Sequence, residues 1–107
     1  MKKQDISSPA NLQVSDTQVL FLLKLYVTGA SPNSARAIAN LKIICEKYLT
    51  KKYELEVIDV YQQPLKAQNE QVIALPMLVK HFPLPLKRLI GDMSNTAKVL
   101  KGLGLNT

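Results

Sequence analysis

The feature that most constrains the fold is an almost unbroken apolar run from Val19 to Thr28, in which Lys24 is the one charged residue. A strand that packed layers cover on both faces has such a run, whereas a strand with one wet face alternates apolar and polar residues. The run is too short to cross a bilayer, and the polar residues before it do not form the basic start of a signal peptide. We therefore predict a central strand over 19–28 in a cytoplasmic protein that has no membrane contact.

The length and composition of the chain favour a single folded domain. Its 107 residues are enough for one core, and an apolar share of 47% with 21% charged residues is far from the composition of disordered chains. Residues 1–17 are polar and show neither helical nor strand periodicity. We predict that residues 1–17 form a flexible N-terminal arm and that residues 18–107 form the domain.

A parallel βαβ unit follows from the first half of the chain. Gly29 ends the first strand, and the pair Ser31-Pro32 is typical of a helix cap followed by a proline at the first helical position. The helix is predicted to run to about Leu49, and residues 53–60 are predicted to form a second strand parallel to the first. The helix positions expected to face the core are Ala35, Ile38, Leu41, Cys45 and Tyr48.

The second half predicts a weak helix, two strands and a last helix. Pro64 can start a helix that reaches about Ala74, and residues 77–81 and 87–90 suit two strands. Ser94 is expected to cap the last helix, which the two glycines at 102 and 104 would end. The apolar positions expected to face inward are Leu65, Val72 and Ile73 in the weak helix, and Ala97, Leu100 and Leu103 in the last one. The order β-α-β-α-β-β-α with a mixed sheet predicts a thioredoxin-like α/β fold.

The residues that catalysis would need are missing from the expected places. A thioredoxin-like oxidoreductase carries two cysteines where its first helix begins, but residues 29–34 contain no sulfur and Cys45 falls on the buried stripe. His81, the one histidine, falls in a predicted strand, and Asp59 at a strand end is expected to cap a turn. We expect no catalytic residue, metal or cofactor, with anion binding by Ser31 to Ser34 as an open alternative to a plain helix cap.

The net charge of +6 comes from 14 Lys and Arg against 8 Asp and Glu, spread along the chain in short doublets. Such a balance favours acidic partners, but no nucleic-acid-binding motif accompanies it. We therefore predict a solvated basic surface and no nucleic-acid partner.

The chain resembles the KaiB family, whose members are partners of the KaiC ATPase in the cyanobacterial circadian clock and in related operons. The similar segments occur in order over about residues 20–103: Leu23 to Val27 with Gly29, Ser31 to Ala37, Val57 to Val60, Pro64, Ala74 to Pro76, and Leu89 to Ser94. The resemblance implies a non-enzymatic protein that binds a KaiC-like ATPase or a related kinase. It also implies two packings of the C-terminal half, one in a dimer or tetramer and one in a thioredoxin-like monomer that docks on KaiC.

The resemblance also suggests residues for these roles. Those for contacts in the oligomer or with partners are Lys24, Arg36, Lys87 and Arg88, and those for the change of packing are Pro76, Gly91 and Asp92. From the sequence, Gly91→Ala combined with Asp92→Arg is expected to favour the thioredoxin-like monomer.

Several differences from the family pattern indicate a divergent member. Leu75 and Met77 flank Pro76 where the family has threonines, Gln71 replaces a lysine, and residues 101–107 replace an acidic tail. The alternatives that stay open are a clock or a stress-adaptation role, residual redox activity, a cis or trans bond at Pro76, and which packing the chain adopts.

Overall fold

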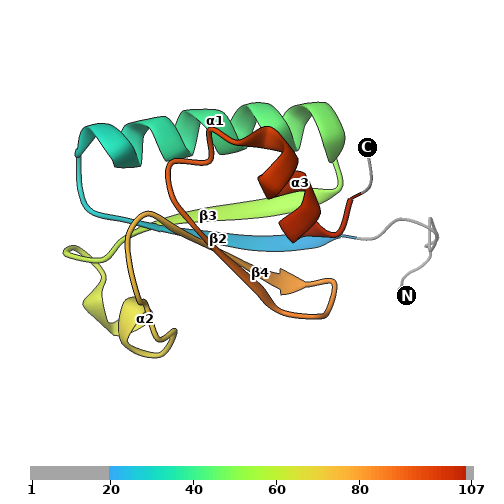
Figure 1. Ribbon diagram of the computed structural model, residues 1–107. Helices are drawn as coiled ribbons and strands as arrows, with labels where there is room; N and C mark the ends of the chain where they lie inside the picture. Colours follow the sequence, from blue (N-terminus) through green and yellow to red (C-terminus); the bar gives the residue numbers. More distant parts are fainter. Residues whose placement is uncertain (1–19, 106–107) are drawn as a thin grey trace, which may run out of the picture.

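Four strands form a mixed sheet in the order β3–β2–β4–β5 in the computed structural model, which describes residues 20–105 (Figure 1). β2 pairs with β3 in parallel and with β4 in antiparallel, and β4 pairs with β5 in antiparallel. The central strand is therefore β2, as the sequence predicts, although residue 19 and the predicted arm over 1–17 lie outside the described residues. The strands are β2 Phe21–Val27, β3 Tyr53–Asp59, β4 Met77–Phe82 and β5 Lys87–Ile90.

Helices cover both faces of this sheet. Figure 1 shows α1 and α3 on one face and α2 on the other. The element order confirms the predicted thioredoxin-like α/β fold. The helices are α1 Pro32–Tyr48, α2 Pro64–Gln68 and α3 Thr96–Leu103.

α1 begins as the sequence predicts but buries a different set of side chains. The Ser31 hydroxyl caps the helix by accepting a hydrogen bond from the Ser34 backbone N–H over 3.1 Å. Ala35, expected inside, is exposed because at 100° per residue it lies about 120° around the helix from Leu41. Tyr48 is also exposed, at the last helical residue. The buried positions are Ser34, Ala37, Leu41, Ile44 and Cys45.

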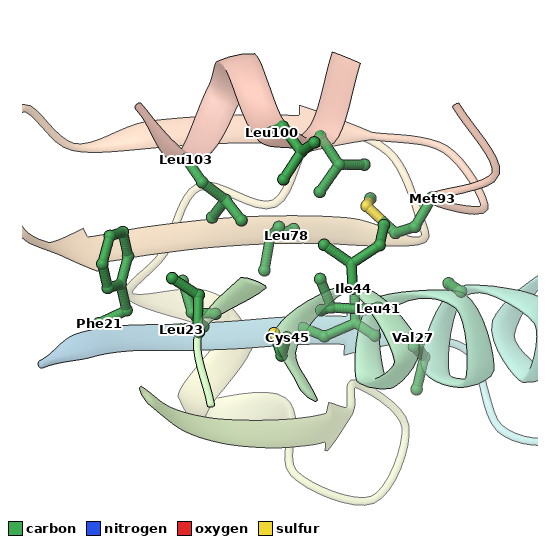
Figure 2. Close-up of a cluster of buried hydrophobic side chains, with 14 residues drawn as sticks. Phe21, Leu23, Val27, Leu41, Ile44, Cys45, Leu78, Met93, Leu100 and Leu103 are labelled. Atoms are coloured by element: carbon green, nitrogen blue, oxygen red, sulfur yellow. The ribbon is translucent and has the colours of Figure 1, made fainter. Parts of the chain in front are cut away.

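The main core lies between the sheet and the pair α1 and α3. Figure 2 shows Leu23 and Leu78 of the sheet facing Leu41 and Cys45 of α1 and Leu100 of α3. The Leu41 and Cys45 side chains are fully buried. This core joins segments from both halves of the chain, so α3 depends on β2 and α1 for its place.

We expect Cys45 to react with thiol reagents at least about a hundredfold more slowly in the folded chain than in denaturant. Burial raises the pKa of the Cys45 thiol to about 12, so little thiolate exists at neutral pH, and the side chain is inaccessible. Mass spectrometry of the labelled chain would measure both rates. Rapid modification without denaturant would show that α1 is not packed on the sheet in solution.

α2 is shorter than the sequence predicts. The helix ends at Gln68, and Gln71 has φ +52°, which the α-helical conformation excludes. Leu65 and Ile73, expected inside, are exposed, and only Val72 of the three expected positions is partly buried. A smaller core beneath α2 instead holds Tyr26, Ile58, Met77 and Val79, with Val60, Ala67, Val72 and Leu75 at its edge.

α3 starts one residue after the predicted cap and ends at the second of the two predicted glycines. Asn95, and not Ser94, caps the helix, and its side chain accepts from the Lys98 backbone N–H over 3.1 Å. Ser94 lies in the turn before the helix, where its backbone N–H donates to the Asp92 carboxylate over 3.0 Å. Gly104, with φ +83°, ends the helix, whereas Gly102 lies inside it. The buried side chains are Val99, Leu100 and Leu103, while Ala97 is exposed.

Candidate functional site

Four of the residues proposed from the sequence come together at one end of the sheet. We call this cluster of Arg36, Pro76, Gly91 and Asp92 the junction. It joins α1, the start of β4 and the end of β5. The Gly91 backbone N–H donates to the Pro76 carbonyl over 3.0 Å and so extends the pairing of the two strands. The Leu75–Pro76 peptide bond is cis.

Asp92 ties the connection before α3 to α1. Its carboxylate lies 3.4 Å from the Arg36 guanidinium Nε, and its backbone carbonyl accepts from the Asn40 side-chain amide over 3.0 Å. Sequence analysis did not identify Asn40, because a polar residue on a helix gives no sign of what it will contact. These two bonds link segments more than fifty residues apart.

The charge on Asp92 is favoured by its surroundings. Hydrogen bonds from the Ser94 side chain and backbone, followed by the Arg36 guanidinium, lower the pKa of the Asp92 carboxyl below its ordinary value. The carboxylate therefore stays charged at neutral pH. Its contribution to stability is present above the ordinary carboxyl pKa and is lost as the pH falls through the lowered value.

A group of hydroxyls lies beside the junction, in the loop where an oxidoreductase would carry thiols. The Ser31 and Ser34 hydroxyls are 2.8 Å apart, and the Thr28 backbone N–H donates to the Ser34 hydroxyl over 3.0 Å. These bonds satisfy the fully buried Ser34. An open hollow of about 450 Å³ adjoins this loop and is lined by Thr28, Ser31, Pro32, Asn33, Arg36, Leu75 and Pro76.

The other basic residues proposed as contacts do not join the junction. Lys24 lies opposite Glu56 of β3, on the sheet face that α2 partly covers. Arg88 lies on the same face, with its guanidinium 3.7 Å from the Glu70 carboxylate. Lys87 is exposed and lies opposite Lys80 on β4. The basic residues thus fall in three regions: Arg36 at the junction, Lys24 and Arg88 on the sheet face that α2 partly covers, and Lys87 opposite Lys80.

Glu70 is a further residue that sequence analysis missed. Its carboxylate is mostly buried and accepts a hydrogen bond from the Tyr26 hydroxyl over 3.3 Å. Desolvation by burial, followed by the Glu70 charge, raises the pKa of the Tyr26 hydroxyl to about 12. Asp59, by contrast, caps a turn as expected, because it accepts from the Tyr61 backbone N–H over 2.9 Å.

Within residues 20–105, the side chains do not form a metal-binding set. No three His, Cys, Asp or Glu residues of that range lie close enough together to hold a metal ion. None of the helices described there has the length and apolar content to cross a membrane. The site that the described residues offer is the junction and the surfaces next to it.

The fold and this loop of hydroxyls define a thioredoxin-like protein without paired thiols at the start of α1. Among solved structures, the chain is similar to the N-terminal domain of Synechococcus elongatus SasA, with 26% identity and a TM-score of 0.65 over 85% of this chain and 89% of that one. It is also similar in fold to mitochondrial thioredoxin 3 from Saccharomyces cerevisiae, with 20% identity and a TM-score of 0.65 over 81% and 79% of the two chains.

Sequence comparison gives the family. The model of the KaiB domain matches residues 24–105. Circadian clock protein KaiB3 from Synechocystis is 50% identical over 84 residues, which are 78% of this chain and 82% of that protein. Circadian clock oscillator protein KaiB from Synechococcus elongatus is 48% identical over 79% of this chain and 83% of its own length. The chain belongs to the KaiB family, which confirms the resemblance seen in the sequence.

Proposed function

We propose that this protein binds a KaiC-like ATPase, or a related kinase, in the cytoplasm and modulates it without catalysing a reaction itself. The observation that carries the proposal is the thioredoxin-like packing of residues 77–103 in a KaiB family member. The family resemblance implies that this packing is the one that docks on KaiC. The hydroxyls at the start of α1 bond to one another and to the backbone, so they serve the packing of the loop and not a reaction.

Lys87 is the proposed basic residue that is best placed for a direct contact with a partner. Among residues 20–105, no carboxylate lies within ion-pair distance of it, whereas Arg36 and Arg88 each face a carboxylate of this chain. A surface cation that has no internal partner is free to meet an acidic patch and to steer association. We infer that Lys87 contacts the partner, while Arg36 and Arg88 maintain the packing that presents it.

Self-association in a second packing is part of the same proposal. In the packing described here, Met77, Leu78 and Val79 are buried, so they add no apolar surface for self-association. The end of β4, the connection after it and β5 still leave four large apolar side chains exposed, namely Phe82, Leu84, Leu86 and Ile90. A dimer or tetramer would cover such side chains, with Pro76, Gly91 and Asp92 at the point where the packing changes.

The test is binding to the KaiC-like ATPase of the same organism, measured by fluorescence anisotropy together with the ATPase rate. We expect a complex at about micromolar concentration and a changed ATPase rate. Lys87→Ala should weaken binding about two- to fivefold at low salt, which is the range for an exposed ion pair. The matched control is Lys42→Ala, an exposed lysine on α1, which should bind like the unmodified chain. Absence of a complex at tenfold higher concentration would overturn the proposal.

A further inference from the structure

The Glu70 carboxylate is the meeting point of three strands. Glu70 belongs to the connection from 69 to 76 between α2 and β4, and its side chain is only 13% exposed. The Tyr26 hydroxyl of β2 lies 3.3 Å from Oε1, His81 Nε2 of β4 lies 3.4 Å from the same oxygen, and Arg88 Nη2 of β5 lies 3.7 Å from Oε2. A single side chain of the connection is thus in contact with three neighbouring strands.

The hydrogen bonding of this carboxylate is incomplete. The Tyr26 contact is long for an O–H donor, and the Arg88 distance is beyond hydrogen-bond length. His81 Nε2 is buried from solvent and makes no hydrogen bond. A carboxylate taken out of water needs charged or hydrogen-bonding partners, and a buried ring nitrogen without one is costly as well.

One proton would satisfy both groups. A neutral imidazole has an N–H at only one of its nitrogens, whereas a doubly protonated one has an N–H at each and a positive charge, so Nε2 then offers a charge-assisted hydrogen bond to the carboxylate 3.4 Å away. We propose that protonation of His81 acts as a pH-sensitive latch, which holds the 69–76 connection against the sheet through Glu70.

The other charged groups on this face do not replace the latch. Lys24, Glu54 and Glu56 line the same hollow of about 390 Å³ as His81, on the neighbouring strands β2 and β3. Glu56 is paired with Lys66 of α2, so its charge is already compensated there. Arg88 carries its charge at every pH of interest, so the change with pH falls on the histidine.

The connection is a segment that such a latch can control. It has no regular secondary structure, and Gln71 within it has a positive φ of 52°. Val72 and Leu75 are its partly buried apolar side chains, packed on the small core around Tyr26. The connection ends at Pro76, which is part of the junction. Contacts between the connection and the sheet therefore also affect the junction.

A change of hydrogen exchange with pH can be assigned to His81 because few other groups could cause it. His81 is the only histidine of the chain, and burial raises the pKa of the Cys45 thiol to about 12. Burial and then Lys87 lower the pKa of Lys80, but Lys80 pairs with Leu23 and Lys87 on the other face of the sheet. The chain's α-amino group remains, and a variant at position 81 separates it from the latch.

The experiment is hydrogen exchange of the backbone amides at 69–76 in the free protein, at about pH 6 and about pH 8, corrected for intrinsic exchange. Protonation adds a favourable contact that is present at the lower pH and lost as the pH rises. We therefore expect the opening constant of this segment to be about three- to tenfold smaller at the lower pH, while that of α1 changes little.

Three variants make the result decisive. His81→Gln keeps a hydrogen-bonding side chain but cannot titrate, and Glu70→Gln removes the carboxylate, so each should abolish the difference between the two pH values. Lys42→Gln, a charge change at an exposed position of α1 on the other face of the sheet, should preserve it. Equal opening constants in the unmodified chain, or a pH difference that survives His81→Gln, would overturn the latch. These measurements use the free chain, so their outcome does not depend on whether the proposed partner binds.

Discussion

Replacing Gly91 by alanine together with Asp92 by arginine is expected to reduce the population of the thioredoxin-like packing at least about thirtyfold. Gly91 has φ +128°, a conformation that L residues rarely adopt, and its added Cβ would meet no atom within 4 Å. The cost is therefore one of backbone conformation, about 2 kcal/mol, which is about thirtyfold in population. Asp92→Arg acts in the same direction, because it removes the partner of Arg36 and the acceptor for Ser94.

This expectation reverses the direction that the sequence suggested for the same double substitution. The sequence shows that Gly91 can turn in more than one way, but it does not show which packing uses the positive φ. In the structure, the thioredoxin-like packing uses it and also uses the Arg36–Asp92 contact. Substitution at these positions should therefore penalise the packing in which they are seen.

NMR spectra and sedimentation velocity would measure the outcome together. We expect the dispersed spectrum of the thioredoxin-like packing to weaken, with a shift to larger species or to unfolded chain. Asp92→Asn is the matched control, since an amide oxygen still accepts from Ser94 while the charge opposite Arg36 is lost. A double variant that is more monomeric and better dispersed than the unmodified chain would show that the sequence-based direction holds.

Leu41→Ala is expected to lower the free energy of unfolding by about 3 kcal/mol, because truncation of a fully buried leucine leaves a cavity in a packed core. Leu41 is 0% exposed and lies between α1 and the sheet, in the same core as the β4 and α3 side chains (Figure 2). A loss of this size should lower the midpoint of urea denaturation without changing the slope.

Ile43→Ala is the matched control for this change, since Ile43 lies two residues away on the same helix and is 65% exposed. Its expected cost is below about 0.5 kcal/mol, the range for surface substitutions. Equal losses for the two variants in chemical denaturation would show that α1 does not bury the face described here.

Sequence patterns predicted the elements whose signals are local and strong. The apolar run of β2, the Ser31 cap of α1 and the β5 strand at 87–90 all formed as expected. Propensity and periodicity act within one or two turns of chain, so they are readable without knowledge of the neighbours. The weaker helix after Pro64 lacked such a signal, and the length predicted for it was wrong.

Sequence also proposed the residues of the junction, through the family resemblance, but not their contacts. Arg36 and Asp92 are fifty-six positions apart by their numbers, and nothing in their local sequence predicts that they meet. Asn40, which holds the Asp92 carbonyl, was missed for the same reason.

What the sequence determined by itself is the kind of chain this is: an α/β protein of thioredoxin-like order, in the KaiB family, without paired cysteines at the first helix. What only the tertiary structure decided is the environment of each polar group. Glu46 and Glu70 are both glutamates near the end of a helix, yet one is exposed on α1 and the other is held between three strands. The reason is physical: burial and charge pairing arise when distant segments pack together. These contacts decide how far each polar group is removed from solvent and which partners it has.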